Sequence, residues 1–304
     1  MAHSDHHGRG HSRSRGNERK MLLAAVLTGG FMVAEVIGGI VSGSLALLAD
    51  AAHMLTDFAA LALAWLAFRF SRWPADRQRT YGFDRLQVLV AYSSGLSLFA
   101  SAVFICYEAI QRLSEPVAVL GGTMMAVAAA GLAINLVVFA ILHSGDRSNL
   151  NMRAATFHVL ADMLGSIGAI AAAGVILTTG WIAADPLASI LVALMVLYGA
   201  WNVVRDSAHI LLEGTPQNVV PADIEADLKT NIPEIEDIHH VHAWSITQER
   251  PMVTLHARLC EQGNADAATR AIKTRLRERF GVAHATVEIE FVHCADGHAH
   301  KHAH

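Results

Sequence analysis

The sequence predicts a mainly α-helical membrane protein, with six transmembrane helices followed by a smaller C-terminal α+β domain. Of the 304 residues, 53% are hydrophobic and only 16% are charged, whereas a soluble globular domain carries about 25% charged residues. The long apolar runs lie almost entirely before Pro216. Beyond Pro216 the apolar periodicity becomes that of short amphipathic helices and strands, so two domains are expected.

The six apolar segments are each long enough to cross a bilayer, which requires about 20 residues. Short connections join them, so consecutive helices are expected to run antiparallel. Arginine and lysine concentrate before the first segment and in the second and fourth connections. By the positive-inside rule, both termini are therefore expected in the cytosol. The predicted spans are 21–41, 45–70, 86–111, 118–142, 151–178 and 186–212.

The region after the last span has the pattern of a small sheet with helices. Its order is helix, strand, strand, helix, strand, which suits an open sheet with helices on one face. The helices show amphipathic periodicity and the strands alternate apolar and polar residues. The expected helices are 222–231 and 265–280, and the expected strands are 238–247, 252–260 and 284–291.

Charge, cysteine content and the chain ends exclude several classes of protein. A net charge of -4 gives no reason to expect a nucleic-acid partner. The three cysteines are far apart and form no CxxC pair, so neither a disulfide framework nor a thiolate zinc site is expected. The His-rich ends cannot build a core and should be disordered. The predicted domains are a tail (1–18), a membrane domain (19–213), a cytosolic domain (214–292) and a second tail (293–304).

Ionisable side chains interrupt the second predicted span in the stretch "ADAAHMLTDF". Each such group costs roughly 2.5 to 3.5 kcal/mol at the centre of a bilayer. Residues four apart lie on one face of a helix, so His53 and Asp57 point the same way. The fifth span repeats this HxxxD spacing with His158 and Asp162. The repetition indicates that the two helices contribute to one polar site.

Two imidazole nitrogens and two carboxylate oxygens form a four-ligand set that suits Zn²⁺. A divalent cation would also cancel the charge of the two buried carboxylates. A single histidine or a single HxxxD pair would more often be a hydrogen-bonded core feature, but two copies in two spans favour a metal. Asp50 can be a ligand or can support the ligands. Glu35 fits an interhelical hydrogen bond or a proton relay better than a ligand.

Histidines and carboxylates also gather on the predicted strands of the soluble domain. The period of two places His240 and His242 on one strand face and His239 on the other. Histidine and carboxylate on adjacent strands predict a second metal site near the surface. Its further candidates are His256 on the next strand and His284, Glu288 and Glu290 on the last one.

Several segments resemble the cation diffusion facilitator family in its zinc-transporting branch. They are "FMVAEVIGGIVSGSLALLADAAHMLTD", "YGFDRLQVL", "NMRAATFHVLADMLGSIG", "LLEGTP" and "HHVHAWSI". The resemblance covers nearly the whole chain except the two tails. It implies a transporter rather than an enzyme, with six helices and a cytosolic ferredoxin-like domain. It also implies a homodimer in a bilayer, expected to be the bacterial inner membrane, that exports divalent metal in exchange for protons.

The resemblance further implies roles for individual residues. The implied ligands of the transport site are His53, Asp57, His158 and Asp162. The implied cytosolic site contains His239, His256 and Glu290, joined by His240, His242 or His284, of which His284 is the expected member. Some family members have another metal site between the second and third helices. Arg79 and Phe83 stand here where that site needs histidines, so we expect it to be absent.

The predicted function is therefore efflux of Zn²⁺, with Cd²⁺ and Co²⁺ as alternative substrates and protons as the counter-substrate. Metal ligands must be deprotonated, so binding metal expels protons and rebinding protons expels metal. His53 and His158 are the natural exchangers, because imidazole titrates near neutrality. An intramembrane metallohydrolase is less consistent, because four protein ligands leave no open coordination position. The other alternative is a membrane-tethered metal sensor. A flux measurement would distinguish it from a transporter, because a sensor would show no net flux.

Overall fold

The structure is a computed structural model, and it describes residues 5–42, 45–114, 121–146, 148–261, 263–292 and 294. Within these ranges, the side chains of residues 5–15, 35, 38–39, 41–42, 45–53, 121 and 123 lie outside the description. The chain divides into two compact units, Met1–Ser207 and Ala208–His304. Each unit is described below by itself.

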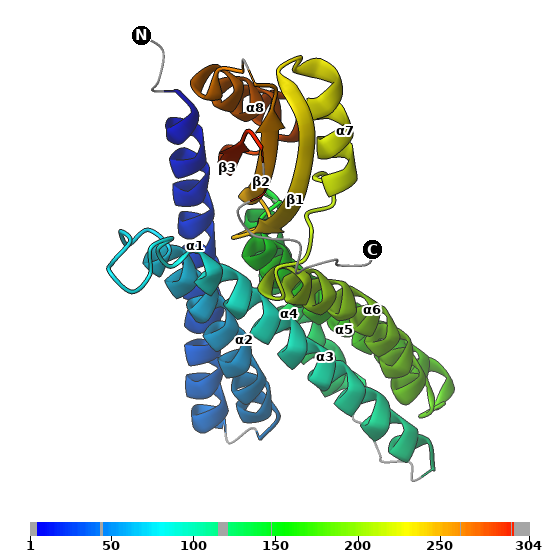
Figure 1. Cartoon of the computed structure of the whole chain (residues 1–304). Coiled ribbons are helices and arrows are strands. Elements are labelled where there is room, and N and C mark those ends of the chain that lie inside the picture. The colour runs from blue at the N-terminus through cyan, green and yellow to red at the C-terminus, as the bar shows by residue number, and fades with distance from the viewer. Residues whose placement is uncertain are drawn as a thin grey trace. The chain divides into compact units, whose positions relative to one another are not determined.

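The first unit consists of long helices that run alongside one another (Figure 1). Among the described residues, four stretches are long and apolar enough to cross a membrane, and they are 84–114, 124–143, 150–179 and 184–211. Two further helices contain the first two predicted spans. The helices are α1 (Asp5–Ser42), α2 (Leu45–Phe70), α3 (Asp84–Ser114), α4 (Gly121–His143), α5 (Leu150–Thr179) and α6 (Ala184–Leu211).

Helix α2 contacts α1, α3 and α5. Gly29 lets α1 approach α2 closely, because a Cβ atom there would lie 2.8 Å from Cδ2 of Phe58. On the other side, the buried Asn151 of α5 donates a hydrogen bond from Nδ2 to the carbonyl oxygen of Ala64, at 2.9 Å. The neighbouring Asn149 caps α5 with its side chain. The hydrogen bond from Asn151 to Ala64 thus joins α5 to α2.

Helix α1 begins at Asp5, so residues 5–18 are helical where the composition predicted a disordered tail. Extending an existing helix is much easier than starting one, because each added residue gains a backbone hydrogen bond. The last part of this extension is also held by tertiary contacts. Glu18 pairs with Arg72, and Oδ1 of Asn17 accepts a hydrogen bond from the backbone N–H of Asp146 at 3.1 Å. The predicted C-terminal tail, 293–304, lies outside the described residues except for Cys294.

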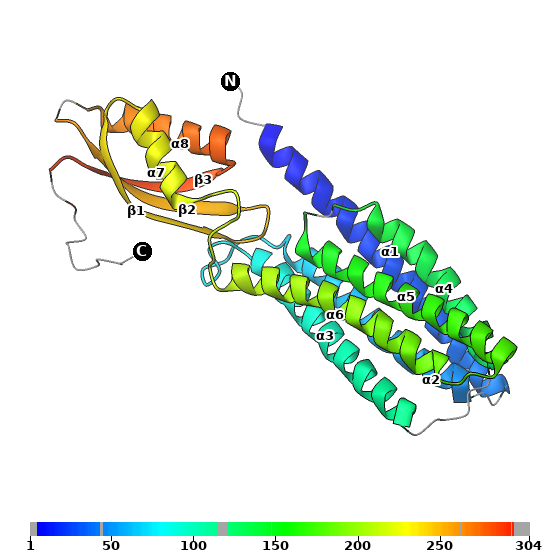
Figure 2. The same ribbon diagram turned by 90° about the vertical axis from the view of Figure 1, so that its right-hand side faces the viewer.

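The second unit has the expected order of helix, strand, strand, helix, strand. Strands β1 and β2 pair antiparallel, and β2 and β3 pair parallel, so β2 is the central strand. Both helices lie on the same face of the sheet (Figure 2). The elements are α7 (Pro221–Asn231), β1 (Ile235–Ser245), β2 (Pro251–Leu259), α8 (Ala265–Phe280) and β3 (His284–Glu290).

The helix-covered face of the sheet forms the core of this unit. Leu255 of β2 packs with Leu228 of α7 and Ile272 of α8, and all three are fully buried. Successive side chains of a strand point to opposite faces. His256 therefore lies on the face that the helices leave uncovered, where the polar residues of the strands gather.

The ion pair between Asp227 of α7 and Arg275 of α8 gives a testable stability prediction. Arg275 donates two hydrogen bonds to the carboxylate, each 2.7 Å long, and these bonds hold the pKa of Asp227 below its usual range. Because the folded-state pKa is lowered, the pair stabilises the unit above the unfolded carboxyl pKa of about 4. That contribution is lost as the pH falls through the lowered pKa.

We expect Asp227→Asn to reduce the free energy of unfolding at neutral pH by about 1 kcal/mol. The difference from the wild type should disappear in strong acid. Hydrogen exchange of the α7 and α8 amides in the full-length protein would measure both effects. Glu261→Gln, at an exposed carboxylate, is the control and should leave exchange unchanged. An Asp227→Asn effect that persists unchanged in strong acid would contradict this explanation.

Candidate metal centres

The first candidate centre lies between α2 and α5 and contains Asp57, His158 and Asp162. Donor atoms of the three side chains all lie within 4.8 Å of one another. Nε2 of His158 is 2.9 Å from Oδ1 of Asp57 and 3.9 Å from Oδ2 of Asp162. Their spacing along α5 places His158 and Asp162 one turn apart on one face, and that face meets Asp57 of α2.

Within the membrane domain, Asp57 of this group is buried, and His158 and Asp162 are partly buried. Asp57 is 4% exposed. A carboxylate at such a position is costly unless it is paired or holds a cation. The second carboxylate, Asp162, increases that cost, and the single imidazole of His158 can offset only one negative charge. The donor set therefore fits a divalent cation, which would neutralise both carboxylates.

The structure thus brings together three of the four residues that the sequence predicts for this site. His53 lies on the same helix as Asp57, but its side chain is outside the described residues. The side chains of Asp50 and Glu35 are also outside the described residues, so their roles stay as predicted. The three described ligand candidates come from helices that the sequence separates by about a hundred residues.

The second candidate centre lies on the uncovered face of the soluble sheet. It contains His239 of β1, His256 of β2, Glu290 of β3 and Cys294, with donor atoms within 4.8 Å of one another. His239 pairs directly with His256 across the two strands. Cys294 lies beyond the end of β3, and its Sγ is 3.7 Å from Nδ1 of His256.

A β-bulge in β1 corrects the predicted orientation of its histidines. His239 pairs with His256 and His242 with Thr254, so three steps along β1 correspond to two along β2. His240 occupies the bulge with a φ of 50°. The extra residue changes which side chains share a face. His239 and His242 therefore lie on the same face, whereas strict alternation places them on opposite faces.

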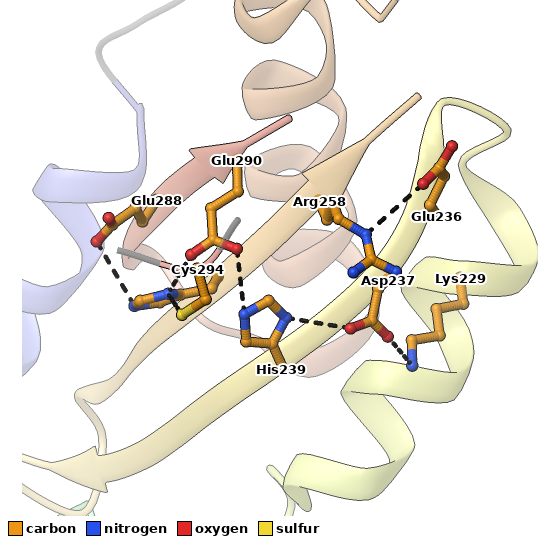
Figure 3. A network of polar contacts seen from close by, with 9 residues as sticks. Lys229, Glu236, Asp237, His239, Arg258, Glu288, Glu290 and Cys294 are labelled. Carbon is orange, nitrogen blue, oxygen red and sulfur yellow. Dashed lines mark hydrogen bonds and ion pairs between the residues drawn. The ribbon is translucent and has the colours of Figure 1, made fainter. Parts of the chain in front are cut away.

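The bulge also gathers three imidazole rings. The ring centroids of His239 and His240 are 5.3 Å apart, and those of His240 and His256 are 5.1 Å apart. Figure 3 shows His239 between Glu290 and Asp237, with Cys294 beside Glu290. Three elements and the segment after β3 thus supply nitrogen, oxygen and sulfur donors to one place.

Buried polar atoms in this centre lack hydrogen bonds in the described part of the structure. They are both ring nitrogens of His239 and Oε2 of Glu290. Nε2 of His239 lies 3.2 Å from Oε2 of Glu290, yet the two do not meet the geometry of a hydrogen bond. Buried polar groups are nearly always satisfied, and exceptions call for an explanation such as an ion. A cation between these atoms would provide that explanation.

Glu290 is suited to hold a cation because it stays ionised. Burial raises the pKa of its carboxyl group, but hydrogen bonds from His256 and Cys294 outweigh burial and keep that pKa below its usual range. Nδ1 of His256 lies 2.8 Å from Oε1 of Glu290. Nε2 of His256 lies 3.5 Å from Oε2 of Glu288, so a second carboxylate flanks the same imidazole.

The structure does not bring His284 to this centre, contrary to expectation. His284 begins β3 opposite Met252, whereas Glu290 ends β3 opposite Arg258. Six residues of extended strand separate them, which is about 20 Å. Instead, the structure brings in Cys294, which the sequence analysis set aside because it has no CxxC partner. The sequence signal that could have identified Cys294 was its position, four residues after Glu290.

Asp76, in the connection between α2 and α3, makes local contacts. Its Oδ1 accepts hydrogen bonds from the backbone N–H groups of Gln78 and Arg79, at 2.8 and 2.6 Å. Its Oδ2 lies 3.1 Å from NH1 of Arg79. These bonds close the turn, and they keep the pKa of Asp76 below its usual range. The expected absence of a metal site in this connection stays a prediction.

Comparison with known proteins agrees with this architecture. Residues 21–212 match the family model of the cation efflux transmembrane domain, and residues 216–292 match that of the cytoplasmic domain of cation efflux proteins. The chain is 47% identical over 297 residues to zinc transporter ZitB of Pectobacterium atrosepticum, which covers 97% of this chain and 92% of that protein. It is 44% identical over 313 residues to zinc transporter ZitB of Escherichia coli, covering 99% of this chain and all of that protein.

A more distant relative is the cadmium, cobalt and zinc/H(+)-K(+) antiporter of Bacillus subtilis. It is 40% identical over 300 residues, which cover 97% of this chain and 94% of that protein. The two family models together span the membrane helices and the soluble sheet described above. The chain therefore belongs to the cation efflux, or cation diffusion facilitator, family of multi-pass membrane transporters.

Proposed function

We propose that the protein exports Zn²⁺ from the cytosol in exchange for protons, through a site formed by His53, Asp57, His158 and Asp162. Cd²⁺ and Co²⁺ are accepted at the same site. Zinc is the metal in the names of the ZitB relatives, and the Bacillus subtilis relative is named for cadmium, cobalt and zinc, with protons and potassium as counter-ions. Imidazole nitrogens and carboxylate oxygens suit these borderline metals, although affinity alone does not set the choice among them.

The observation that carries this proposal is the approach of Asp57, on α2, to His158 and Asp162, on α5. Packing alone would place apolar side chains at this contact. The repeated HxxxD spacing adds His53 as the fourth ligand, one turn from Asp57 on the same helix. Two neutral imidazoles and two carboxylates would leave the metal-filled site without net charge.

Exchange with protons follows from the same ligands. The 2.9 Å contact between Nε2 of His158 and Oδ1 of Asp57 is a hydrogen bond in which the imidazole N–H donates to the carboxylate. Zn²⁺ requires these donor atoms without their protons, so metal binding releases protons. When protons return from the other side, they compete with the metal for the same atoms. A proton gradient directed inward thus drives zinc outward as the site alternates between the two sides.

Orientation and assembly are part of the proposal. The arginines at the C-terminal end of α2 and in the connection to α3 favour the cytosolic side for that connection and for both termini. The membrane is the bacterial inner membrane, since the compared relatives are bacterial. The soluble unit holds a second metal at His239, His256 and Glu290. It joins two copies of the chain, as the name of its family model, ZT_dimer, suggests.

Measuring metal flux tests the proposal directly. The full-length protein would be reconstituted in liposomes that have an imposed pH difference, and ⁶⁵Zn entry into the acidic lumen would be followed. We expect uptake that needs the pH gradient and stops when a proton ionophore collapses it. A fluorescent pH indicator in the lumen should report alkalinisation when zinc enters.

The controls separate transport from binding alone. A membrane-tethered sensor would bind zinc without net flux, and liposomes without protein report leakage. Flux that persists unchanged without a proton gradient, at equal zinc gradients, would argue against antiport but not against zinc transport. An absence of flux under every condition would overturn the transport proposal itself.

A further inference from the structure

Cys294 lies among the donor atoms of the soluble-domain centre, although the sequence pattern gave no reason to expect a thiolate site. Its Sγ is 3.7 Å from Nδ1 of His256 and within 4.8 Å of donor atoms of His239 and Glu290. Cys294 comes four residues after Glu290 and just beyond the end of β3. The chain therefore returns to the uncovered face of the sheet after the strand has ended.

The surroundings of Cys294 are those of a metal ligand rather than of a packing residue. A structural cysteine usually behaves as a small apolar side chain and packs among other apolar groups. Here its neighbours in the centre are two imidazoles and one carboxylate. The carboxylate belongs to Glu290, whose side chain is only 3% exposed and whose Oε2 makes no hydrogen bond in the described part of the structure.

The spacing of these donors is close to that of a tetrahedral zinc site. With metal–nitrogen bonds near 2.0 Å and metal–sulfur bonds near 2.3 Å, the ligand atoms of a tetrahedral site lie about 3.3 to 3.6 Å apart. The measured separations of 3.2 Å between His239 and Glu290 and 3.7 Å between Cys294 and His256 fall close to this range. The remaining separations, up to 4.8 Å, need only small side-chain movements.

We propose that Cys294 is the fourth ligand of the soluble-domain metal centre, which is thereby a closed His₂GluCys site for Zn²⁺ or Cd²⁺. The inference rests on the proposed metal centre at His239, His256 and Glu290, and it adds a ligand of a different chemical class. The thiolate of Cys294 and the carboxylate of Glu290 together match the charge of one divalent cation. Sulfur favours zinc and cadmium over magnesium and manganese.

With Cys294 as the fourth ligand, the soluble-domain centre would be a closed site. Four protein ligands leave no coordination position for water or a substrate, which is typical of structural zinc sites. The bound ion would connect β1, β2 and β3 with Cys294. The thiolate also makes the site sensitive to pH, because the metal must displace the thiol proton.

Cobalt substitution tests the ligand directly, because Co²⁺ bound to a thiolate has a near-ultraviolet charge-transfer band. The proposed intramembrane ligands contain no sulfur, so the full-length protein in detergent can be used. We expect the band in the wild-type protein and its loss in Cys294→Ser. Cd²⁺ affinity of the soluble-domain centre should fall by more than about tenfold in the same variant.

Two matched variants serve as controls. Cys106→Ser and Cys260→Ser remove the other cysteines of the chain and should leave the band unchanged. A band that survives Cys294→Ser would overturn the proposal. His256→Ala separates a failure of the Cys294 proposal from a failure of the metal centre itself. If His256→Ala lowers Co²⁺ binding while the wild type shows no thiolate band, the centre exists without Cys294. If His256→Ala leaves Co²⁺ binding unchanged, the metal centre itself is wrong.

Discussion

Zinc transport is expected to be lost in Asp57→Asn, the substitution with the largest predicted effect on flux. The asparagine side chain has nearly the same shape, so the helices should still pack, but one of the two carboxylate charges is gone. Asp57 is 4% exposed and contacts His158, so no water can substitute for that charge. Removing one member of a buried charged set costs about 3–5 kcal/mol. We therefore expect metal affinity to fall at least about a hundredfold.

The measurement is ⁶⁵Zn flux in liposomes together with equilibrium zinc binding to the purified variant. Asp206→Asn is the matched control, because Asp206 lies on α6, pairs with Arg153 and is not a member of the metal group. It should transport zinc, whereas Asp57→Asn should not. Wild-type flux in Asp57→Asn would eliminate the intramembrane site as described.

The second large effect is expected for His256→Ala in the soluble unit. His256 is 9% exposed and lies at the middle of the second centre, near Glu290, Glu288 and Cys294. Its loss should remove this centre and reduce bound zinc by about one ion per chain. Zinc at a hundred times its dissociation constant stabilises a folded unit by about 2.7 kcal/mol, and this gain should vanish. Equilibrium dialysis and thermal unfolding with added zinc measure both effects.

His284→Ala is the informative control for this prediction. The sequence predicts His284 as a ligand, whereas the structure places it at the opposite end of β3 from Glu290. We expect His284→Ala to keep the wild-type zinc stoichiometry and the wild-type gain in stability. Loss of zinc in His284→Ala, with retention in His256→Ala, would mean that the metal centre lies at the end of β3 that contains His284.

The arrangement of elements could be predicted largely from local patterns. The order of helices and strands in the soluble unit agrees with the periodicity, and the strand bounds differ from the predictions by a few residues. The long helices follow from the apolar runs. The start of α1 could not be predicted in this way, because residues 5–18 are polar and join the helix through its continuity and through contacts such as Glu18 with Arg72.

The two candidate centres differ in how much of each could be predicted from the spacing of residues along the chain. For the intramembrane centre, a repeated four-residue spacing identified both helix faces, and only their meeting had to come from the fold. For the soluble centre, alternation along β1 placed His239 and His242 on opposite faces, whereas a single bulge at His240 puts them on the same face. A bulge has no reliable signal in one sequence, since it arises from the pairing of two strands.

Composition and short-range spacing were enough to establish a membrane protein, its six long helices, its αββαβ soluble domain and its paired HxxxD motifs. Each of these features depends on a pattern within a single segment of chain. Within such a segment, the geometry of a helix or strand fixes the direction of each side chain. Packing between distant segments decided the rest, including the approach of Asp57 to His158 and the arrival of Cys294 beside His256. Such contacts join residues far apart in the chain, so they depend on how whole elements fill space against one another.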